Sequence, residues 1–178
     1  ISLIYFSTHG TMTDDQAVIF LCDGEEELLL TPEALAPLLS SIPGYKILIL
    51  DTCNSGAFIQ KGIDSLQVRH AFTGKDIYII TSAGGCEASW QWQNREPGAA
   101  GGESYFSSLL IGGLAGHRAA DINHDYTVTI NEAFMYLSES CASSSPQRYP
   151  SDTANFPLYV YTPDAPAAQP AISGLTFE

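Results

Sequence analysis

The chain has 178 residues, 45% of them hydrophobic, which suffices for one domain with a buried core and argues against a disordered chain. Its 20 acidic residues outnumber its 7 lysines and arginines, so the formal net charge is -13. Such a surface repels phosphate backbones and anionic headgroups, and no apolar run approaches the roughly 18 residues of a membrane span. We therefore expect no nucleic acid and no membrane as partner, and cationic partners such as basic peptides or calcium are favoured.

Three short apolar runs predict strands at Ser2–Phe6, Lys46–Leu50 and Ile77–Thr81. Because these runs are apolar on both faces, they are typical of central strands in a parallel sheet that is covered on each side. Between the first two we expect a hairpin with arms at Ala17–Leu21 and Leu28–Leu30.

Helices are predicted between and after these strands. Thr31 is placed to cap the first helix, and a second helix is expected directly after Cys53. Glu103–Leu114 and Ile130–Leu137 carry apolar positions at helical spacing and predict two more.

A last strand is predicted at Pro157–Tyr161. The alternation of strands and helices predicts an α/β fold, a three-layer sandwich with a mostly parallel central sheet and helices on both faces. We assign it to residues 1–161 and treat the Ala/Pro-rich segment 162–178 as a loosely attached tail.

Two of the predicted strands end in matched fashion. The letters STHG follow the first and DTCNSG the second, so His9 and Cys53 each stand three places after the last apolar strand residue. Ligand sites in open α/β sheets lie beyond the carboxyl ends of strands, which places both residues at the expected edge. Because side chains alternate along a strand, Ser7 shares a face with His9 and Asp51 shares one with Cys53.

A cysteine next to a histidine predicts nucleophilic catalysis. The Cys53 thiolate would attack a carbonyl while His9 takes up the proton or stabilises the anion. The backbone amides of Gly10 and Cys53 would hold the oxyanion, with help from the start of the helix expected after Cys53. The alternative is a buried structural thiol and a core histidine, but their equal placement after two strands favours the reactive pair.

An apolar strand ending in His-Gly, followed by one ending in Asp-x-Cys-x-Ser-Gly, resembles the caspase-like (clan CD) cysteine peptidases. DTCNSG is more similar to the metacaspase and legumain branches than to the QAC motif of animal caspases, because an acid stands two places before the cysteine. The resemblance covers the chain from Ile1 to about Tyr161. It implies a caspase-like fold and a dyad of Cys53 and His9, with no cofactor required for the chemistry and a peptide or protein as substrate.

The resemblance also implies a specificity pocket. Metacaspases line it with the residues two before the cysteine and two before the histidine, which are Asp51 and Ser7 here. The segment ITSAGGCEASW resembles the one that supplies a pocket serine, Ser82. A carboxylate at the pocket floor selects a cationic side chain, so we expect cleavage after Arg or Lys, with legumain-like cleavage after Asn as the alternative.

Family members normally carry a strand, a helix and a strand before the histidine-bearing strand, on which this chain begins. The resemblance therefore implies an N-terminal segment or a second chain that completes the sheet. Caspase-like enzymes are often cut between their two halves, which implies self-cleavage at Arg95 in loop 93–102, or at Asn94 in the legumain-like alternative.

Six of the 20 acidic residues lie between Asp14 and Glu27. Metacaspases hold an activating calcium in acidic loops after the histidine strand, which implies Asp14, Asp15 and Asp23 as ligands. Calcium needs several oxygens gathered at one point, and flexible loops provide them. The alternative is a solvated turn.

A second acidic cluster matches positions one, three, five and twelve of an EF-hand loop, which makes its residues candidate calcium ligands: Asp121, Asn123, Asp125 and Glu132. Tyr126 replaces the glycine at position six, where a positive φ is costly for a tyrosine, so the match is expected to fail there. A structural alternative is a capping box in which Thr129 and Glu132 start a helix.

Two functions follow from this reading: a cysteine endopeptidase, or a non-catalytic calcium-responsive binding module on the same fold. An α/β-hydrolase is excluded by Asp51, because the nucleophile elbow requires glycine two places before the nucleophile. With four cysteines the chain is no disulfide scaffold, and its localisation is open.

Overall fold

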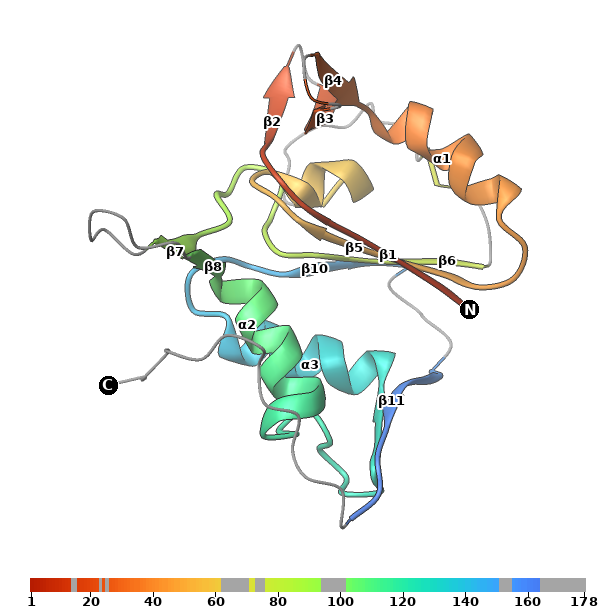
Figure 1. The fold of residues 1–178 in the computed structure, drawn as a ribbon, viewed down its shortest axis with the longest axis vertical. Helices are drawn as coiled ribbons and strands as arrows, with labels where there is room; N and C mark the ends of the chain where they lie inside the picture. The colour runs from red at the N-terminus through yellow and green to blue at the C-terminus, as the bar shows by residue number, and fades with distance from the viewer. Residues whose placement is uncertain are drawn as a thin grey trace.

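The computed structural model describes residues 1–13, 16–22, 24, 26–61, 71–72, 76–93, 102–150 and 155–163. These residues form a mixed α/β fold with three α-helices around a sheet that contains both parallel and antiparallel strands (Figure 1). The α/β prediction is confirmed at this level. None of the described helices is long and apolar enough to cross a membrane.

The central sheet has the strand order β1-β5-β6-β10. Strands β1 (Ser2–Ser7), β5 (Lys46–Asp51) and β6 (Ile77–Thr81) are parallel, and β10 (Gln147–Tyr149) runs antiparallel to β6. The three parallel strands are the predicted ones. The short β10 was not predicted, because its letters QRY carry no apolar alternation.

The strands differ in how far they are covered. Every residue of β5 and β6 is buried, which explains their unbroken apolar runs. Residues of β1 alternate between half-buried and exposed, and Leu3 and Tyr5 are 61% and 45% exposed. Within the described residues β1 is therefore an edge strand, and the predicted cover on both of its faces is not found there.

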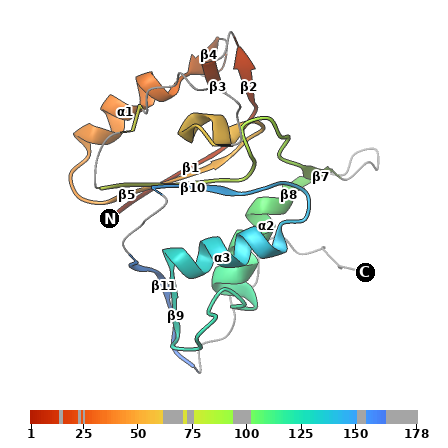
Figure 2. The ribbon, with the colours of Figure 1, turned by 180° about the vertical axis from the view of Figure 1, so that it is seen from behind.

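Helices lie on both sides of this sheet (Figures 1 and 2). On one side, α1 (Pro32–Ser41) and the short 3-10 helix η1 (Ser55–Ile59) pack with Leu48 and Leu50 of β5. On the other side, Ile47 and Ile49 of β5 pack against α2 and α3, which span Tyr105–Ile111 and Ile130–Ser140. Alternation along β5 thus supplies apolar side chains to two separate cores.

The capping predictions are confirmed. Thr31 caps α1, with its Oγ1 accepting from the Ala34 amide at 3.2 Å. Thr129 and Glu132 form the predicted capping box of α3. By contrast, α2 is shorter than predicted, because the chain from Gly112 to Gly116 continues as a π-helical turn whose Gly113 lies directly against the Tyr136 ring.

The helix expected after Cys53 does not form as an α-helix in the described residues. Asn54 adopts a left-handed conformation, with φ at 56°, and the chain then makes only the five-residue η1. A short 3-10 helix has a weak dipole, so the predicted help to an oxyanion from a helix start is not supported.

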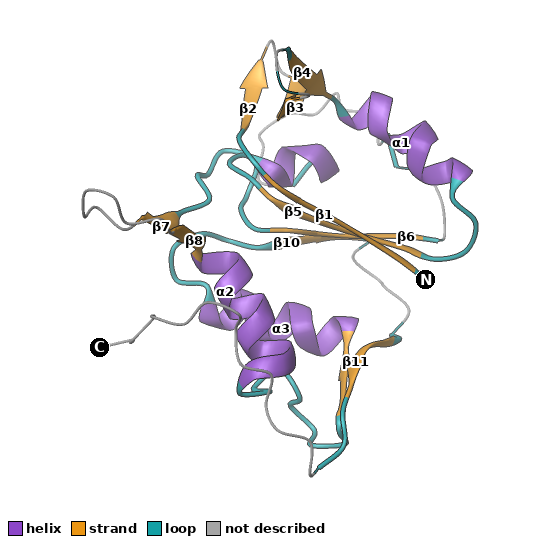
Figure 3. Ribbon diagram, in the orientation of Figure 1, coloured by secondary structure: helices purple, strands orange, loops and turns teal. Residues whose placement is uncertain are grey.

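The remaining strands form smaller sheets (Figure 3). The predicted hairpin is confirmed as β3 and β4, and an unpredicted β2 pairs with β3. The predicted last strand is confirmed as β11, but it pairs with β9 rather than joining the central sheet. Two further short strands, β7 and β8, were not predicted and pair antiparallel with each other. The bounds are Gly10–Thr13 for β2, Gln16–Cys22 for β3, Glu27–Leu30 for β4, Gln91–Gln93 for β7, Gly102–Ser104 for β8, Thr127–Thr129 for β9 and Pro157–Val160 for β11. Of the predicted tail, residues 164–178 lie outside the described part of the chain.

Candidate functional site

The two motif-bearing strands are neighbours in the sheet. Strands β1 and β5 run parallel, and Ser7 pairs with Asp51 at the last position of their register. His9 and Cys53 each follow two residues later, so they leave the sheet at the same level. Adjacent strands lie about 4.8 Å apart, which brings the two turns together at the carboxyl edge.

The backbones of these two turns are in direct contact. A Cβ atom added at Gly10 would lie 2.5 Å from the carbonyl oxygen of Cys53 and 2.6 Å from Oγ1 of Thr52. No side chain larger than hydrogen fits at such distances, so glycine is required here by close approach. The Thr8 amide also donates to the Asp51 carbonyl at 3.3 Å, which ties the start of the histidine turn to the end of β5.

The histidine turn is fixed from its other side by β3. The His9 carbonyl accepts from the Phe20 amide at 2.9 Å, and Thr8 Oγ1 donates to the Phe20 carbonyl at 2.7 Å. The His9 side chain is exposed, whereas Cys53 is half-buried, with its thiol 3.7 Å from the Ser89 carbonyl. An imidazole and a thiol therefore stand on adjoining turns that are both anchored to the sheet.

The loop that follows β6 supports the Cys53 turn. A Cβ at Gly56 would come within 2.8 Å of backbone atoms of Ala83, Gly84 and Gly85, so the two segments pack backbone to backbone. Asn54 reinforces this contact, because its Nδ2 donates to the Gly85 carbonyl at 2.8 Å. The left-handed turn after Cys53 is thus held by the loop that follows the neighbouring strand β6.

Glu87 joins this support to a third segment, the loop before β10. Its Oε2 accepts from the amides of Gly84 and Ser145 at 3.0 and 2.8 Å, and its Oε1 accepts from the Ser145 hydroxyl at 2.9 Å. The backbone carbonyl of Glu87 accepts from the Asn54 amide at 2.7 Å. The bonds from the Gly84 and Ser145 amides, and the bond from the Ser145 hydroxyl, lower the pKa of Glu87 against the opposing effect of burial.

The Asp51 carboxylate lies beneath the site and is surrounded by hydroxyl groups. Asp51 is 4% exposed. Its Oδ1 accepts from Ser89 at 2.8 Å, and its Oδ2 accepts a short bond from Ser107 and a longer one from Tyr5 at 3.5 Å. Ser7, the other residue predicted from the strand ends to line a pocket, has an exposed side chain.

Ser82, the third predicted pocket residue, is fully buried. Its hydroxyl donates to the Thr52 carbonyl at 3.3 Å and lies 3.4 Å from the Ser55 hydroxyl. The structure therefore places Ser82 under the Cys53 turn as a support, away from the surface. The other predicted residues near the site, Asp14, Asp15, Asp23 and Arg95, lie outside the described part of the chain.

The EF-hand-like loop adopts at its sixth position the backbone angle that was expected to be costly for a tyrosine. Tyr126 adopts a positive φ of 68°, so the glycine position is filled by a tyrosine after all. The Tyr126 amide donates to Asp121 Oδ2 at 3.1 Å, and its ring packs edge-on against the Tyr161 ring. Hydrogen bonds to Asp121 and the aromatic contact offset the strain that a left-handed tyrosine carries.

Asp121 is the centre of this loop. Burial opposes its ionisation, but hydrogen bonds from the Tyr161 hydroxyl and from the amides of Tyr126, Asp125 and His124 outweigh burial and lower the pKa of Asp121. The hydrogen bond from the Tyr161 hydroxyl to Asp121 Oδ2, 2.6 Å long, is also the main reason that the pKa of Tyr161 is raised. The loop is thus a carboxylate-centred turn held by protein donors.

The oxygens of this loop are directed at groups of the protein. Glu132 Oε2 accepts from the backbone amide and the hydroxyl of Thr129 at 2.9 and 2.7 Å, and Nδ2 of Asn123 donates to Asp125 Oδ2 at 3.1 Å. No group of three or more His, Cys, Asp and Glu side chains placed to hold a metal occurs among the described residues. Calcium binding by these residues stays a prediction.

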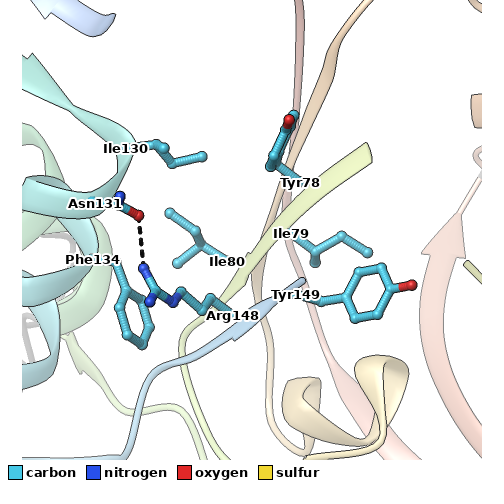
Figure 4. A pocket seen from close by; sticks show the side chains of 8 residues that line it. All are labelled: Tyr78, Ile79, Ile80, Ile130, Asn131, Phe134, Arg148 and Tyr149. Atoms are coloured by element: carbon cyan, nitrogen blue, oxygen red, sulfur yellow. Dashed lines mark hydrogen bonds between the residues drawn. The ribbon is translucent and has the colours of Figure 1, made fainter. Parts of the chain in front are cut away.

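A small pocket lies away from His9 and Cys53, where α3 packs against strands β6 and β10 (Figure 4). Arg148 reaches across it, donating to the Asn131 side-chain oxygen at 2.8 Å and lying 4.8 Å from the centre of the Phe134 ring. None of its lining residues was predicted as a site residue. The pocket is a packing feature where α3 meets the sheet.

Sequence reasoning missed four residues around the site: Tyr5, Glu87, Ser89 and Ser107. Glu87 and Ser89 lie in the ITSAGGCEASW segment that was recognised as part of a pocket, so that segment carried a signal for both. Tyr5 and Ser107 reach Asp51 from an edge strand and from α2. Nothing local marks them, because their contact joins residues far apart in the chain.

Comparison with known protein families finds no family that matches this chain, and comparison with curated proteins finds no matching relative.

Proposed function

We propose that the chain is a cysteine endopeptidase domain with the caspase-like fold, a three-layer sandwich in which His9 and Cys53 form the catalytic dyad. The observation that carries the proposal is the backbone contact of Gly10 with Cys53, at the level where parallel neighbours β1 and β5 leave the sheet. Because of this contact, two motifs that stand at matched positions in the sequence also lie side by side in the structure. A structural thiol and an unrelated surface histidine have no need of it.

The reaction is acyl transfer. His9 takes the proton of the Cys53 thiol, and the sulfur attacks the carbonyl carbon of the scissile peptide bond. Amides of Gly10 and Cys53 stabilise the oxyanion, and His9 passes its proton to the leaving amine as the carbon–nitrogen bond breaks. Water, deprotonated by His9, then hydrolyses the thioester, and the proton returns to the Cys53 sulfur.

Specificity for Arg or Lys rests on Asp51. Its carboxylate lies two residues before the nucleophile, and every contact that the structure gives it comes from a neutral hydroxyl. The negative charge is therefore without a cationic partner among the described residues and is suited to a basic substrate side chain. The overall charge of -13 favours the approach of such a substrate.

The caspase-like assignment includes an N-terminal segment or a second chain that completes the sheet at β1. The described part of the chain leaves this strand at the edge, with Leu3 and Tyr5 exposed. Self-cleavage at Arg95 belongs to the same proposal. The flanking strands β7 and β8 pair with each other, Gln93 opposite Gly102, so a cut between them would leave the hairpin joined by its hydrogen bonds.

The test is a panel of fluorogenic peptides that differ only in the residue before the cut bond: Arg, Lys, Asn or Asp. We expect cleavage after Arg and Lys, loss of turnover in Cys53→Ala and His9→Ala, and wild-type turnover in Cys86→Ala, which removes an exposed free thiol. Equal turnover by the wild type and Cys53→Ala contradicts the proposal. A preference for Asn contradicts only the basic pocket.

The second candidate function is a non-catalytic binding module. Labelling of the cysteine thiols distinguishes it from the peptidase. A dyad thiol in a cysteine peptidase reacts rapidly with iodoacetamide at mildly acidic pH, whereas an ordinary thiol such as the exposed Cys22 reacts slowly. Selective labelling of Cys53 supports the peptidase, and uniform labelling with no turnover supports the module. Repeating the assay with calcium and with chelator tests the calcium prediction.

A further inference from the structure

Segment 87–90 runs beside the Cys53 turn. Glu87 and Ser89 are half-buried, whereas the residues on either side of each are exposed. This alternation is typical of an extended chain that turns every second residue toward its neighbour. The backbone carbonyls of the same two residues contact the turn: that of Glu87 accepts from the Asn54 amide at 2.7 Å, and that of Ser89 accepts from the Cys53 thiol at 3.7 Å. The segment therefore meets the proposed nucleophile through its backbone.

The side chain of Ser89 is anchored to strand β5. Its hydroxyl donates to Asp51 Oδ1 at 2.8 Å, and that carboxylate is 4% exposed on a strand whose every residue is buried. Hydrogen bonds to a carboxylate are roughly twice as strong as those between neutral groups. One serine thus binds Asp51 with its hydroxyl and the thiol of Cys53 with its carbonyl. A shift of the Ser89 carbonyl away from the thiol is opposed by the buried Asp51.

The contact with the carbonyl bears on where the Cys53 sulfur stands. A single side-chain torsion places this sulfur, and three staggered positions are open to it. An acceptor on one side favours the position that points the thiol at that acceptor. A thiol is a weak donor, so the contact orients the sulfur yet costs little to break when the proton passes to His9. Misplacement of a reacting group by about 1 Å costs roughly 100-fold in rate, so this orientation matters to the chemistry.

We propose that Ser89 is a positioning residue for the dyad: anchored by its hydroxyl to Asp51, it uses its backbone carbonyl to orient the Cys53 thiol for attack. The inference rests on the proposed peptidase function and deepens it. It does not depend on the preference for Arg or Lys, because Asp51 acts here by holding a hydroxyl of the protein and needs no contact with the substrate.

The test is Ser89→Ala, which removes the anchoring hydroxyl and leaves the backbone carbonyl in the chain. With the fluorogenic peptides we expect kcat to fall about fivefold at unchanged KM, because the sulfur is oriented less often while the substrate binds as before. A fivefold change corresponds to about 1 kcal/mol, the size of one hydrogen bond. Without peptide, alkylation of Cys53 by iodoacetamide should slow by a similar factor, since it uses the same oriented sulfur.

Two other cysteines of the same molecule serve as internal controls. In mass spectrometry the exposed Cys22 should be alkylated at the wild-type rate, and Cys141, which is 6% exposed, should stay protected unless the fold loosens. Ser89→Thr keeps the hydroxyl and should restore both kcat and the alkylation of the nucleophile. Ser108→Ala is the matched control, because that hydroxyl donates to the Ser104 carbonyl at 2.8 Å, and it should leave both rates unchanged.

The outcomes are distinguishable. If the wild type cleaves a peptide and Ser89→Ala keeps both the wild-type kcat and the wild-type rate of Cys53 alkylation, the inference is overturned while the peptidase stands. A rise in either rate overturns it too, because the Ser89 carbonyl would then restrain the thiol. Exposure of Cys141, or a failure of threonine to restore the rates, overturns it as well, because the effect would then be a general loss of packing. If the wild type cleaves no peptide, or if Cys53→Ala cleaves as well as the wild type, the peptidase proposal itself falls and the inference falls with it.

Discussion

Replacing Gly10 by alanine tests the contact on which the proposed dyad depends. The added methyl group would lie 2.5 Å from the Cys53 carbonyl oxygen and 2.6 Å from Thr52 Oγ1. Ordinary contacts between carbon and oxygen are about 3.4 Å, so the two turns must separate by roughly 1 Å. Neither turn moves freely, because the Phe20 amide fixes one and the loop after β6 fixes the other.

The separation acts on catalysis more than on stability. A misplacement of about 1 Å costs roughly 100-fold in rate, which corresponds to about 2.7 kcal/mol in the activation free energy. Overpacking at one backbone contact is expected to lower the free energy of unfolding by about 1–3 kcal/mol, which a domain of this size tolerates. We therefore expect folded Gly10→Ala protein with kcat/KM reduced about 100-fold.

The measurement combines peptide turnover with thermal unfolding, and Gly112→Ala is the matched control. The same methyl group at Gly112 would meet the His117 ring, with Nε2 3.1 Å away, and that side chain can rotate aside. Gly112 has helical backbone angles, so alanine is well tolerated there and activity should stay within about twofold of wild type. A folded Gly10→Ala protein with near-normal kcat/KM would refute the proposal that this contact aligns His9 with Cys53.

Two further predictions concern the carboxylates. Glu87→Gln should lower the free energy of unfolding by about 1–3 kcal/mol, because two backbone amides and the Ser145 hydroxyl lose a charged acceptor, while the exposed Glu27→Gln should change it little in denaturant titrations. Since the folded pKa values of Glu87 and Asp121 are lowered, their stabilisation is complete above the unfolded values, about 4, and is lost as pH falls through the folded values. The acid limb of thermal stability should therefore become shallower in Glu87→Gln, and an unchanged limb would count against this assignment. Tyr161→Phe removes a donor to Asp121 and should raise the pKa of Asp121 in an NMR titration; no upward movement would show that the tyrosine hydroxyl does not hold this carboxylate ionised.

Sequence patterns predicted those parts of the fold whose causes are local. The Thr31 cap and the Thr129–Glu132 capping box each depend on residues within one turn of a helix, and both are present. The two buried strands β5 and β6 were also predicted, since an unbroken apolar run is typical of a strand that is covered on both faces. Strand β1 also carries a short apolar run, yet it lies at the edge of the described sheet. Its place in the sheet depends on which strands lie beside it, and the apolar run alone does not contain that information.

In the candidate site, too, features with local causes were predicted and features that depend on distant contacts were not. His9 and Cys53 could be paired from sequence because two parallel neighbours end at one edge, so equal offsets along the chain become equal positions in space. Tyr126 was misjudged, because the cost of its left-handed angle is local while the hydrogen bond and ring contact that stabilise it are not. Contacts across the fold decide such cases.

The proposed dyad and the proposed pocket floor are held by different parts of the fold, and this separates two kinds of substitution. The turn bearing His9 is fixed through β3, and the turn bearing Cys53 through the loop after β6 and Glu87. Asp51, by contrast, receives Ser107 from α2, which packs against the opposite face of the sheet from η1. Changes at Gly10 or Glu87 should therefore reduce turnover of every substrate alike, whereas changes on the Asp51-facing side of α2 should alter which substrate is preferred. A substitution at Ser107 that slowed all substrates equally would place that helix among the supports of the dyad and remove the distinction.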